Sequence, residues 1–299
     1  MTQTDSLVMT NILVTGSNSG FGKLTSLALA RRGHTVFATM RDIAGKNRPA
    51  ADDVRRLAEV DKLSVHVLEL DVTSDASVQR AIDAALDRAG HLDAVINNAG
   101  YGMGGLAETY TSEQLTRILD TNVVGPQRVN RAVLPSMRAR HAGLIVQLSS
   151  GLGRIVLPFV GPYAATKWAI EALAETYRYE LQPTGVEMTI VQPGAFPTSF
   201  GPSMDVGAEQ ARASGYGPLE HGLAQFGRSL EQMFSIPNGP DPQEVADAIV
   251  DLVETPAGKR PARVVVDRFN GAGCAALNDA HAQVQASVLG TMGMSALVA

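Results

Sequence analysis

Short apolar runs alternate along the chain with longer stretches of helical periodicity. Most of the runs are continuously apolar, as is typical of parallel strands covered on both faces. They predict strands at residues 11–15, 35–39, 65–70, 94–96, 144–148, 188–191 and 263–266. The longer stretches predict helices at residues 21–32, 75–89, 112–140 and 163–182. This alternation predicts an α/β fold: a Rossmann-type, doubly wound parallel sheet of about seven strands with helices on both faces.

Three segments depart from this rhythm. Residues 42–60 are rich in charge and predict a solvated helix after the second strand. Residues 195–238 have no strand pattern, but apolar side chains recur there at helical spacing: Leu219, Leu223, Phe226, Leu230 and Met233. Residues 270–299 are rich in Ala, Gly and Val and carry few charges. We therefore expect a single domain over residues 1–299, with its core at 11–267, a helical substrate lid at 195–238 and a C-terminal extension at 270–299.

The composition narrows the class of protein. Apolar residues make up 45% of the chain and charged residues 18%, so a large core can form. The net charge of −5 lacks the basic excess typical of nucleic-acid binding. A single cysteine, Cys274, excludes an intrachain disulfide and a cysteine-based zinc site, and the histidines are far apart, so we expect no metal. Residues 1–10 lack a signal-peptide pattern and no apolar run approaches the ~18 residues that cross a bilayer. We expect a cytoplasmic protein without nucleic-acid or membrane partners.

A glycine-rich turn follows the first predicted strand and precedes a helix. It reads Thr15-Gly16-Ser17-Asn18-Ser19-Gly20-Phe21-Gly22. Glycines let a backbone turn sharply and approach a pyrophosphate, and the amides at a helix start attract the phosphate charge. The spacing is G-x-x-x-G-x-G, not the G-x-G-x-x-G of the two-domain dehydrogenases. Its position between strand and helix favours a dinucleotide site over a plain turn.

Tyr163 and Lys167 stand four residues apart, which puts the phenol and the ammonium on one face of a helix. Free tyrosine titrates near ~10, and a nearby ammonium favours the phenolate and lowers the pKa. The pair therefore predicts an acid/base group that works near neutral pH. An ordinary exposed helix face can show the same spacing. Ser150 decides between the two, because it follows a predicted strand at the sheet edge where open α/β sheets bind ligands.

Taken together, these motifs resemble the short-chain dehydrogenase/reductase family. Further matching motifs are Asp71-Val72, Asn97-Asn98-Ala99-Gly100, Asn122, Ser149-Ser150, Pro193-Gly194 and Thr198. The resemblance covers about residues 11–267. It implies an oxidoreductase that transfers a hydride between a nicotinamide and the carbonyl or secondary alcohol of a small molecule, with a tyrosine as general acid/base. A catalytically silent dinucleotide-binding regulator or sensor on the same fold is the alternative.

The resemblance also assigns roles to residues. The implied catalytic set is Asn122, Ser150, Tyr163 and Lys167, with Ser150 matching the family's serine better than Ser149 and Asn122 holding a water that serves Lys167. Substrate contacts fall to Ser150, Leu152 and Tyr163. The implied cofactor contacts are Gly16, Ser17, Ser19, Gly20, Phe21, Gly22, Arg41, Asp71, Val72, Asn98, Ala99, Gly100, Tyr163, Lys167, Pro193, Gly194, Phe196 and Thr198. Two of these have plainer interpretations: Asp71 as a helix cap and Asn98 as a turn residue.

The end of the second predicted strand bears on the cofactor. An acidic residue there binds the adenosine ribose diol of NAD, whereas an arginine accommodates the 2′-phosphate of NADP. Met40 matches the acidic position and Arg41 follows it, so we expect NADP, with Ser17 as a further hydroxyl donor. NAD stays possible, because Asp42 could bind the diol and Arg41 could face solvent.

Substrate and partners follow from softer patterns. The side chains expected to line an apolar pocket are Leu152, Phe159, Met204, Leu219, Phe226 and Met233, although core packing is an equal interpretation. The stretch Ala38-Thr39-Met40-Arg41-Asp42 resembles the hydroxysteroid and retinol branch of the family, which implies an apolar ketone or alcohol. The family's usual contact helices fall at residues 112–140 and 163–182, so we expect a homodimer or homotetramer. The C-terminal extension could cover the pocket, join that interface or be frayed.

Overall fold

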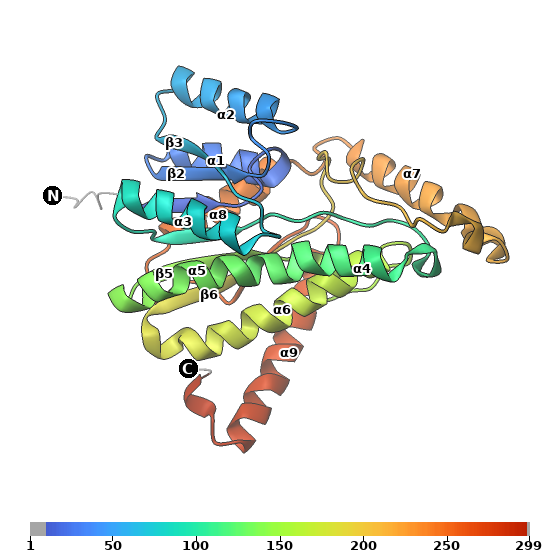
Figure 1. Cartoon of the computed structure of the whole chain (residues 1–299). Helices are drawn as coiled ribbons and strands as arrows, with labels where there is room; N and C mark the ends of the chain where they lie inside the picture. The colour runs from blue at the N-terminus through green and yellow to red at the C-terminus, as the bar shows by residue number, and fades with distance from the viewer. Residues whose placement is uncertain (1–9, 298–299) are drawn as a thin grey trace.

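The computed structural model describes residues 10–297 and confirms the predicted fold class (Figure 1). Within that range the sheet has seven strands, all parallel, in the order β3-β2-β1-β4-β5-β6-β7. Their bounds are β1 (Asn11–Val14), β2 (Thr35–Met40), β3 (Val65–Glu69), β4 (Ala94–Asn97), β5 (Gly143–Leu148), β6 (Val186–Pro193) and β7 (Arg263–Val266). The strand order reverses between β1 and β4, and ligands of open α/β sheets bind at such a point. The stretch interpreted as lacking a signal peptide lies, except for Thr10, outside the described residues.

Two layers of helices cover the sheet. Helices α3 (Asp75–Ala89), α5 (Gly125–Arg140) and α6 (Gly161–Leu181) pack on one face, and α1 (Gly20–Arg31) and α8 (Gln243–Glu254) on the other. Side chains alternate across a strand, so Phe37 of β2 joins the first layer and its neighbour Val36 joins the second. Helix α2 (Arg48–Val60) covers the β2–β3 edge through Ala51 and Val54. The predicted helix at 42–60 thus begins later, because Asp42, with φ +51, accepts a hydrogen bond from Lys46 N and forms a turn.

The long helix predicted at residues 112–140 is divided. Helix α4 (Ser112–Leu119) passes into a π-helical turn, η2 (Asp120–Val124), and then into α5. A capping box at Thr111 and Gln114 starts α4. Single π-turns inside helices occur frequently at functional sites. This turn contains Asn122, one of the predicted catalytic residues.

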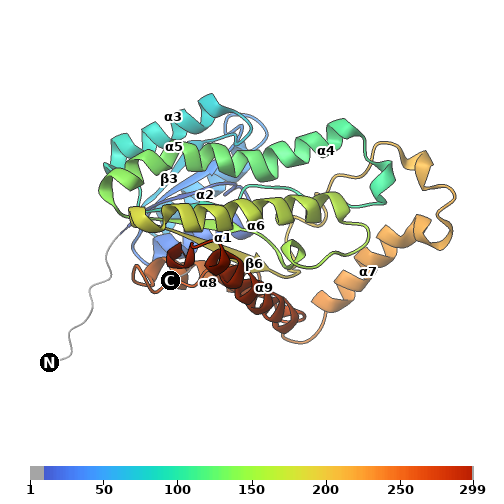
Figure 2. The ribbon, with the colours of Figure 1, turned by 90° about the horizontal axis from the view of Figure 1, so that it is seen from below.

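The two segments outside the strand–helix rhythm are largely helical. Figures 1 and 2 show α7 (Gly222–Phe234) beyond the end of the sheet and α9 (Gly271–Thr291) projecting beside α6. The shorter 3₁₀ turns are η1 (Ala107–Thr109), η3 (Gly151–Gly153), η4 (Gln182–Thr184), η5 (Gln210–Ala213), η6 (Gly217–His221) and η7 (Ser295–Leu297). Leu223 and Phe226 of α7 are half-buried as predicted, but Leu219 precedes the helix and is exposed. The frayed interpretation of the extension is wrong for α9, which buries Cys274 and Asn278. No helix in residues 10–297 is long and apolar enough to span a membrane.

Candidate active site

Helix α6 carries the predicted acid/base pair. The helix starts at Gly161, and Pro162 in its first turn supplies a fixed φ that suits a helix start. Lys167 is buried, and its Nζ donates a hydrogen bond to the Leu148 carbonyl oxygen at 3.0 Å. The same Nζ lies 5.5 Å from the centroid of the Tyr163 ring. The end of β5 therefore holds the ammonium beneath the phenol, so the plain exposed-face interpretation is wrong for Lys167.

Burial dominates the titration of both groups. It lowers the pKa of Lys167 to about 8, and the Glu171 carboxylate opposes that shift. It raises the pKa of the Tyr163 phenol well above its ordinary value, and contact with Ser150 opposes that shift. In this structure desolvation and Ser150 therefore set the pKa of Tyr163, and the lowering expected from the ammonium and a bound nicotinamide ring together stays a prediction.

The two adjacent serines at the end of β5 serve different partners. Ser149 is buried, and its Oγ donates to Glu171 Oε1 at 2.8 Å. Ser150 is half-buried, accepts from Leu152 N at 3.2 Å and lies against the Tyr163 phenol. The geometry thus favours Ser150 over Ser149 as the serine that meets a substrate, as the spacing predicted. Leu152 lies beside it in the turn η3.

Asn122 is anchored in the π-helical turn. Its Oδ1 accepts from Tyr101 N at 3.0 Å and its Nδ2 donates to Tyr101 O at 2.9 Å. The Nδ2 group also donates to Thr166 Oγ1 at 3.1 Å, next to Lys167 on α6. Gly100 passes so close that a Cβ there would lie 3.0 Å from Asn122 Oδ1. The side chain therefore joins the strand end after β4 to the helix that carries the acid/base pair.

The glycine-rich turn has the close backbone approach that its motif predicted. Gly16 has φ +70, and a Cβ there would lie 2.9 Å from Ala99 Cα. A Cβ at Gly22 would lie 2.3 Å from Gly16 O and 2.4 Å from Asn98 Nδ2. Asn98 fixes the turn through its Nδ2, which donates to Thr15 O at 2.8 Å. Asn98 is thus more than a turn residue of its own strand, since it bridges β4 to the turn after β1.

Thr15 also shapes the glycine-rich turn, although the motif did not predict a role for it. Its Oγ1 accepts from the main-chain amides of Asn98 and Ala99, both at 3.0 Å. Its position directly before Gly16 was the available sequence signal. The hydroxyl holds the ends of β1 and β4 in register at the crevice.

The residues predicted to favour NADP agree only in part with the structure. Met40 is buried and Arg41 is exposed, as a phosphate-binding arginine requires. The hydroxyl of Ser17 does not fit the predicted donor role, because it is buried, donates to Val14 O at 3.0 Å and accepts from Ser26 Oγ at 3.0 Å.

The capping interpretation of Asp71 is wrong. Ser74 caps α3, since its side chain accepts from Ser77 N. Asp71 Oδ1 instead accepts from Thr73 N at 2.9 Å and from Thr73 Oγ1 at 2.8 Å. Val72, which follows, is buried against Gly125. The pair Asp71-Val72 therefore forms a tight turn at the sheet edge.

The segment after β6 folds back over the glycine turn. The Phe196 ring meets the Phe21 ring edge-on, with centroids 5.6 Å apart. Ser199 Oγ donates to Ser19 Oγ at 3.1 Å, and Thr198 lies beside Gly20. The segment includes Pro193, at the end of β6, and Gly194, where a Cβ would lie 2.3 Å from Asp267 Cγ. The structure thus brings the predicted residues of this segment to the predicted turn.

Apolar side chains lie near the Tyr163 phenol. The Phe200 ring lies 5.3 Å from the Tyr163 ring, centroid to centroid. A Cβ at Gly102 would lie 2.8 Å from Met204 Cγ and 2.9 Å from the Phe200 ring. Met204 was predicted for this wall, whereas Phe200 was missed, although it follows Thr198 by only two residues. Leu219 does not belong to the wall, because it is 51% exposed.

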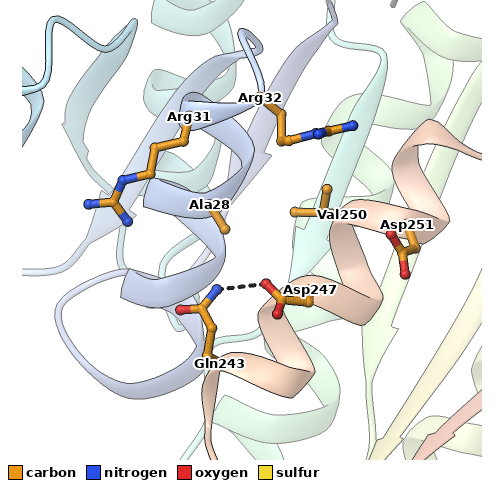
Figure 3. Close-up of a pocket in the computed structure, with 7 residues that line it drawn as sticks. All are labelled: Ala28, Arg31, Arg32, Gln243, Asp247, Val250 and Asp251. Carbon is orange, nitrogen blue, oxygen red and sulfur yellow. Dashed lines mark hydrogen bonds between the residues drawn. The ribbon is translucent and has the colours of Figure 1, made fainter.

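A separate groove lies on the outer surface between α1 and α8, as Figure 3 shows. In it Gln243 Nε2 donates to Asp247 Oδ1 at 2.8 Å. The residues that line it are Ala28, Arg31, Arg32, Gln243, Asp247, Val250 and Asp251. These share no member with the predicted site, which lies at the opposite end of α1.

Comparison with known proteins agrees with this arrangement. A family model described as short chain dehydrogenase matches residues 10–206. The 3-ketodihydrosphingosine reductase of Bacteroides thetaiotaomicron is 36% identical over 63% of this chain, and the match covers 65% of that reductase, slightly less than two thirds. The estradiol 17-beta-dehydrogenase 1 of Rattus norvegicus is 32% identical over 83% of this chain and 71% of its own. The alcohol dehydrogenase from the archaeon Thermococcus sibiricus, complexed with 5-hydroxy-NADP, superposes with a TM-score of 0.69 at 25% identity, over 86% of this chain and 96% of its own. The chain belongs to the short-chain dehydrogenase/reductase family, enzymes that act on CH–OH groups.

Proposed function

We propose that this enzyme reduces the carbonyl group of an apolar small molecule, or oxidises the corresponding secondary alcohol, with NADP(H) and with Tyr163 as the group that gives or takes the proton. The observation that carries this proposal is the contact of the Tyr163 phenol with Ser150 above the buried ammonium of Lys167. All three side chains meet at the carboxyl ends of the strands, where open α/β sheets bind ligands.

The crevice fits a dinucleotide. The positive φ of Gly16 and Gly20 and the lack of room for a Cβ at Gly22 keep the turn compact at the start of α1, whose positive end attracts phosphate. Several residues along the crevice would hold the cofactor. They are Gly16, Ser19, Gly20, Phe21 and Gly22 for the pyrophosphate, Asp71 and Val72 for the adenine, Asn98, Ala99 and Gly100 for the ribose, and Pro193, Gly194, Phe196 and Thr198 for the nicotinamide. Tyr163 and Lys167 complete the set.

The end of β2 supports NADP over NAD. Arg41 is exposed and directly follows Met40 at the carboxyl end of β2, which is the edge of the sheet where open α/β sheets bind ligands. The carboxylate of Asp42 is engaged within its own turn, where it accepts from Lys46 N at 2.7 Å. A guanidinium suits a 2′-phosphate, whereas the ribose diol of NAD favours a free carboxylate.

The side chains supply position and protons. When bound, the nicotinamide ring donates or accepts the hydride. In the reductive direction Tyr163 Oη donates its proton to the carbonyl oxygen, and the Ser150 hydroxyl stabilises the negative charge that develops there. The Lys167 ammonium stabilises the phenolate left behind. Asn122, by its likeness to the family's asparagine, holds a water that returns a proton toward Lys167.

The wall around the phenol supports an apolar substrate. The Phe200 ring lies beside Tyr163, Met204 joins Phe200 at Gly102, and Leu223 of α7 joins Met204 at Gly104. Pockets of this kind bind apolar ligands and orient them by a few polar groups, here Ser150 and Tyr163. The names of two relatives, a 3-ketodihydrosphingosine reductase and an estradiol 17-beta-dehydrogenase, agree with a large apolar ketone or alcohol.

A homodimer through α4 and α6 is part of the proposal. Four large apolar side chains on this side are exposed: Leu115, Val124, Trp168 and Leu173. Two small residues of α6, Ala165 and Ala172, are also exposed, and small side chains allow a partner helix to approach closely. Light scattering on the purified protein tests this, since a monomer at micromolar concentration contradicts it.

The function is tested by binding and turnover together. NADPH and NADH are titrated separately by fluorescence, and a panel of apolar and polar ketones is then followed by absorbance of the reduced cofactor. The proposal expects tighter NADPH binding and faster turnover of apolar ketones. The Arg41→Ala variant should weaken NADPH binding about tenfold or more while leaving NADH binding unchanged, with Asp42→Asn as the matched control. Equal loss for both cofactors contradicts the assignment of Arg41, and dinucleotide binding without turnover would indicate the silent regulator.

A further inference from the structure

A buried cluster of charged groups lies directly behind Lys167. Its centre is Glu171, one turn further along α6 and 2% exposed. Tyr163, Lys167 and Glu171 recur at intervals of four, so the three side chains follow one stripe of the helix. Two consecutive residues at the end of β5 hold the last two: Leu148 O, in the strand's last residue, accepts from Lys167 Nζ, and Ser149 Oγ, just after the strand, donates to Glu171 Oε1.

Three hydrogen-bond donors and the guanidinium of Arg154 converge on the Glu171 carboxylate. Oε1 accepts from Ser149 Oγ at 2.8 Å and from Gln192 Nε2 at 2.6 Å. Oε2 lies 3.1 Å from Arg154 Nε and 3.3 Å from Arg263 Nε. Each of these groups comes from a different segment: the end of β5, β6, the residue after η3, and β7. A carboxylate with this many polar contacts is held in one orientation.

Helix α9 completes the cluster. Asn278 Nδ2 donates to Gln192 Oε1 at 2.6 Å, and Asn278 Oδ1 accepts from Arg154 Nε at 3.0 Å. Asn278 therefore orients the two side chains that bind opposite oxygens of Glu171. A buried ion pair by itself contributes little net stability, because desolvation offsets the attraction between the charges. Stabilising the fold is thus a weak explanation for a cluster built at this position.

We propose that Glu171 is a positioning residue for catalysis, which keeps the buried Lys167 side chain in its ammonium form, and that α9 supports it through Asn278. This inference rests on the proposed function for its catalytic consequence. Burial alone favours the neutral amine, and a fixed anion one turn away opposes it. The C-terminal helix, far from the cofactor turn, thereby becomes part of the apparatus that supports the ammonium.

Other charged groups face Lys167 and Glu171 from the surrounding elements. The cluster also contains Arg154, Arg263 of β7 and Glu175 of α6, and in it Arg263 Nη2 donates to Glu175 Oε2 at 2.7 Å. From α9, His281 lies 3.7 Å from Glu175, and Cys274 is buried nearby.

On the other side of α6, the turn η2 brings the neutral Asn122 to Thr166 and pairs its Asp120 with Arg128. Tyr163 lies above Lys167. Among these groups Glu171 is the one that raises the pKa of Lys167.

The direct test reads the protonation of Lys167 without turnover. The chain has few lysines, which are Lys23, Lys46, Lys62, Lys167 and Lys259, so a protein labelled with ¹³C at lysine Cε gives few resonances, and Lys167→Arg assigns the one of interest. In Glu171→Gln we expect the Lys167 titration to move down by about one pH unit or more. The matched control is Glu175→Gln, which removes a carboxylate from the same cluster and should leave the titration in place. An unshifted Lys167 in Glu171→Gln, or an equal shift in both variants, overturns the proposal.

The kinetic test separates positioning from structure. The basic limb of the pH profile of kcat for carbonyl reduction should move down with the Lys167 titration in Glu171→Gln and be restored in Glu171→Asp. A uniform loss of kcat at every pH indicates a merely structural role and contradicts the proposal. If wild-type protein shows no turnover, the proposed function fails, while the NMR titration still decides the role of Glu171.

If Glu171→Gln does not fold, a second variant tests the proposal. That substitution leaves the buried Arg154 with Glu175, at 4.0 Å, as its remaining acidic partner, which is destabilising. Glu171→Gln with Arg154→Met removes both members of the Arg154–Glu171 ion pair, and Arg263 keeps its hydrogen bond to Glu175. The double variant should still lower the Lys167 titration, because Glu171 is the partner that acts on Lys167. A titration that returns to the wild-type position in the double variant overturns the proposal.

Discussion

Asn122 Nδ2 donates a hydrogen bond to Thr166 Oγ1 at 3.1 Å, which ties the π-helical turn between α4 and α5 to the helix that carries the acid/base pair. The same amide spans both polar groups of the Tyr101 backbone. The π-turn therefore places the Asn122 side chain where it hydrogen-bonds both to the Tyr101 backbone and to Thr166 of α6. An asparagine in an ordinary helix interior would be unfavourable.

Removing the Asn122 amide should reduce stability and turnover together. Asn122→Ala leaves the partly buried Tyr101 N–H and C=O without these partners, and we expect the free energy of unfolding to fall by about 1–3 kcal/mol. Denaturant unfolding measures the first effect and steady-state kinetics the second. Thr166→Val is the matched control, because it removes the Asn122–Thr166 bond but keeps both bonds to Tyr101, so its loss should be smaller. Equal or greater destabilisation by Thr166→Val would refute this account of the turn.

The glycine turn should not tolerate a methyl group at Gly22. The added Cβ would lie 2.3 Å from Gly16 O and 2.4 Å from Asn98 Nδ2, so Gly22→Ala must displace the turn. We expect dinucleotide affinity to fall by at least tenfold and the thermal midpoint to drop. Gly227→Ala offers the opposite expectation, because nothing lies within 4 Å of its Cβ position and alanine is the better helix former by about 0.5–1 kcal/mol. Retained NADPH affinity in Gly22→Ala would contradict the assignment of the turn.

The pocket beside the phenol should become narrower when Gly102 gains a side chain. A Cβ at Gly102 meets Met204 Cγ at 2.8 Å and the Phe200 ring at 2.9 Å, so these side chains must shift, and the Phe200 ring lies 5.3 Å from the Tyr163 ring, centroid to centroid. Gly102→Ala should raise the KM for bulky apolar ketones several-fold and leave that for the smallest ketones nearly unchanged. Kinetics with ketones of graded size measure this. A uniform change across the series would mean that Phe200 and Met204 do not line the substrate path.

Helix α9 should depend on one polar side chain for its attachment. Asn278→Leu removes the hydrogen bonds to the buried Gln192 Oε1 and Arg154 Nε, and we expect a cost of about 1–3 kcal/mol in unfolding free energy. Leu277→Ser is the matched control on the same helix, since Leu277 is 45% exposed and its change should have little effect. Chemical denaturation of both variants decides the matter. Comparable losses in the two variants would show that α9 is held by its apolar surface instead.

The fold was predictable because its strands are short, apolar and regularly interrupted. Every predicted strand is present, and boundaries moved by one to a few residues; β6, for example, extends over Val186–Pro193 where 188–191 was predicted. The division of the 112–140 helix was not predictable, because the π-turn depends on bonds from Asn122 to a residue 21 positions earlier. Helix α8 escaped the initial pattern, although its buried positions Val245, Ile249 and Leu252 have helical spacing.

The site was predictable only as far as local motifs reach. The motifs located the tyrosine, the lysine, the serine and the glycine turn, because each motif sits at the end of a strand or the start of a helix. They did not reveal that the Ser17 hydroxyl is turned inward, that Thr15 joins β1 to β4, or that Phe200 lies against Tyr163. These contacts join segments far apart in the chain, and no local spacing encodes them.

The central claim is that the Tyr163 phenol donates the proton to the carbonyl oxygen during reduction. Tyr163→Phe keeps the ring against Phe200 and removes only the hydroxyl. Single-turnover reduction of an apolar ketone by bound NADPH, measured beside NADPH affinity, tests this most directly. The account predicts unchanged affinity within about twofold and a rate reduced by roughly 10²–10⁴-fold, the usual contribution of a general acid. A Tyr163→Phe enzyme that binds NADPH and reduces the ketone at the wild-type rate would contradict it.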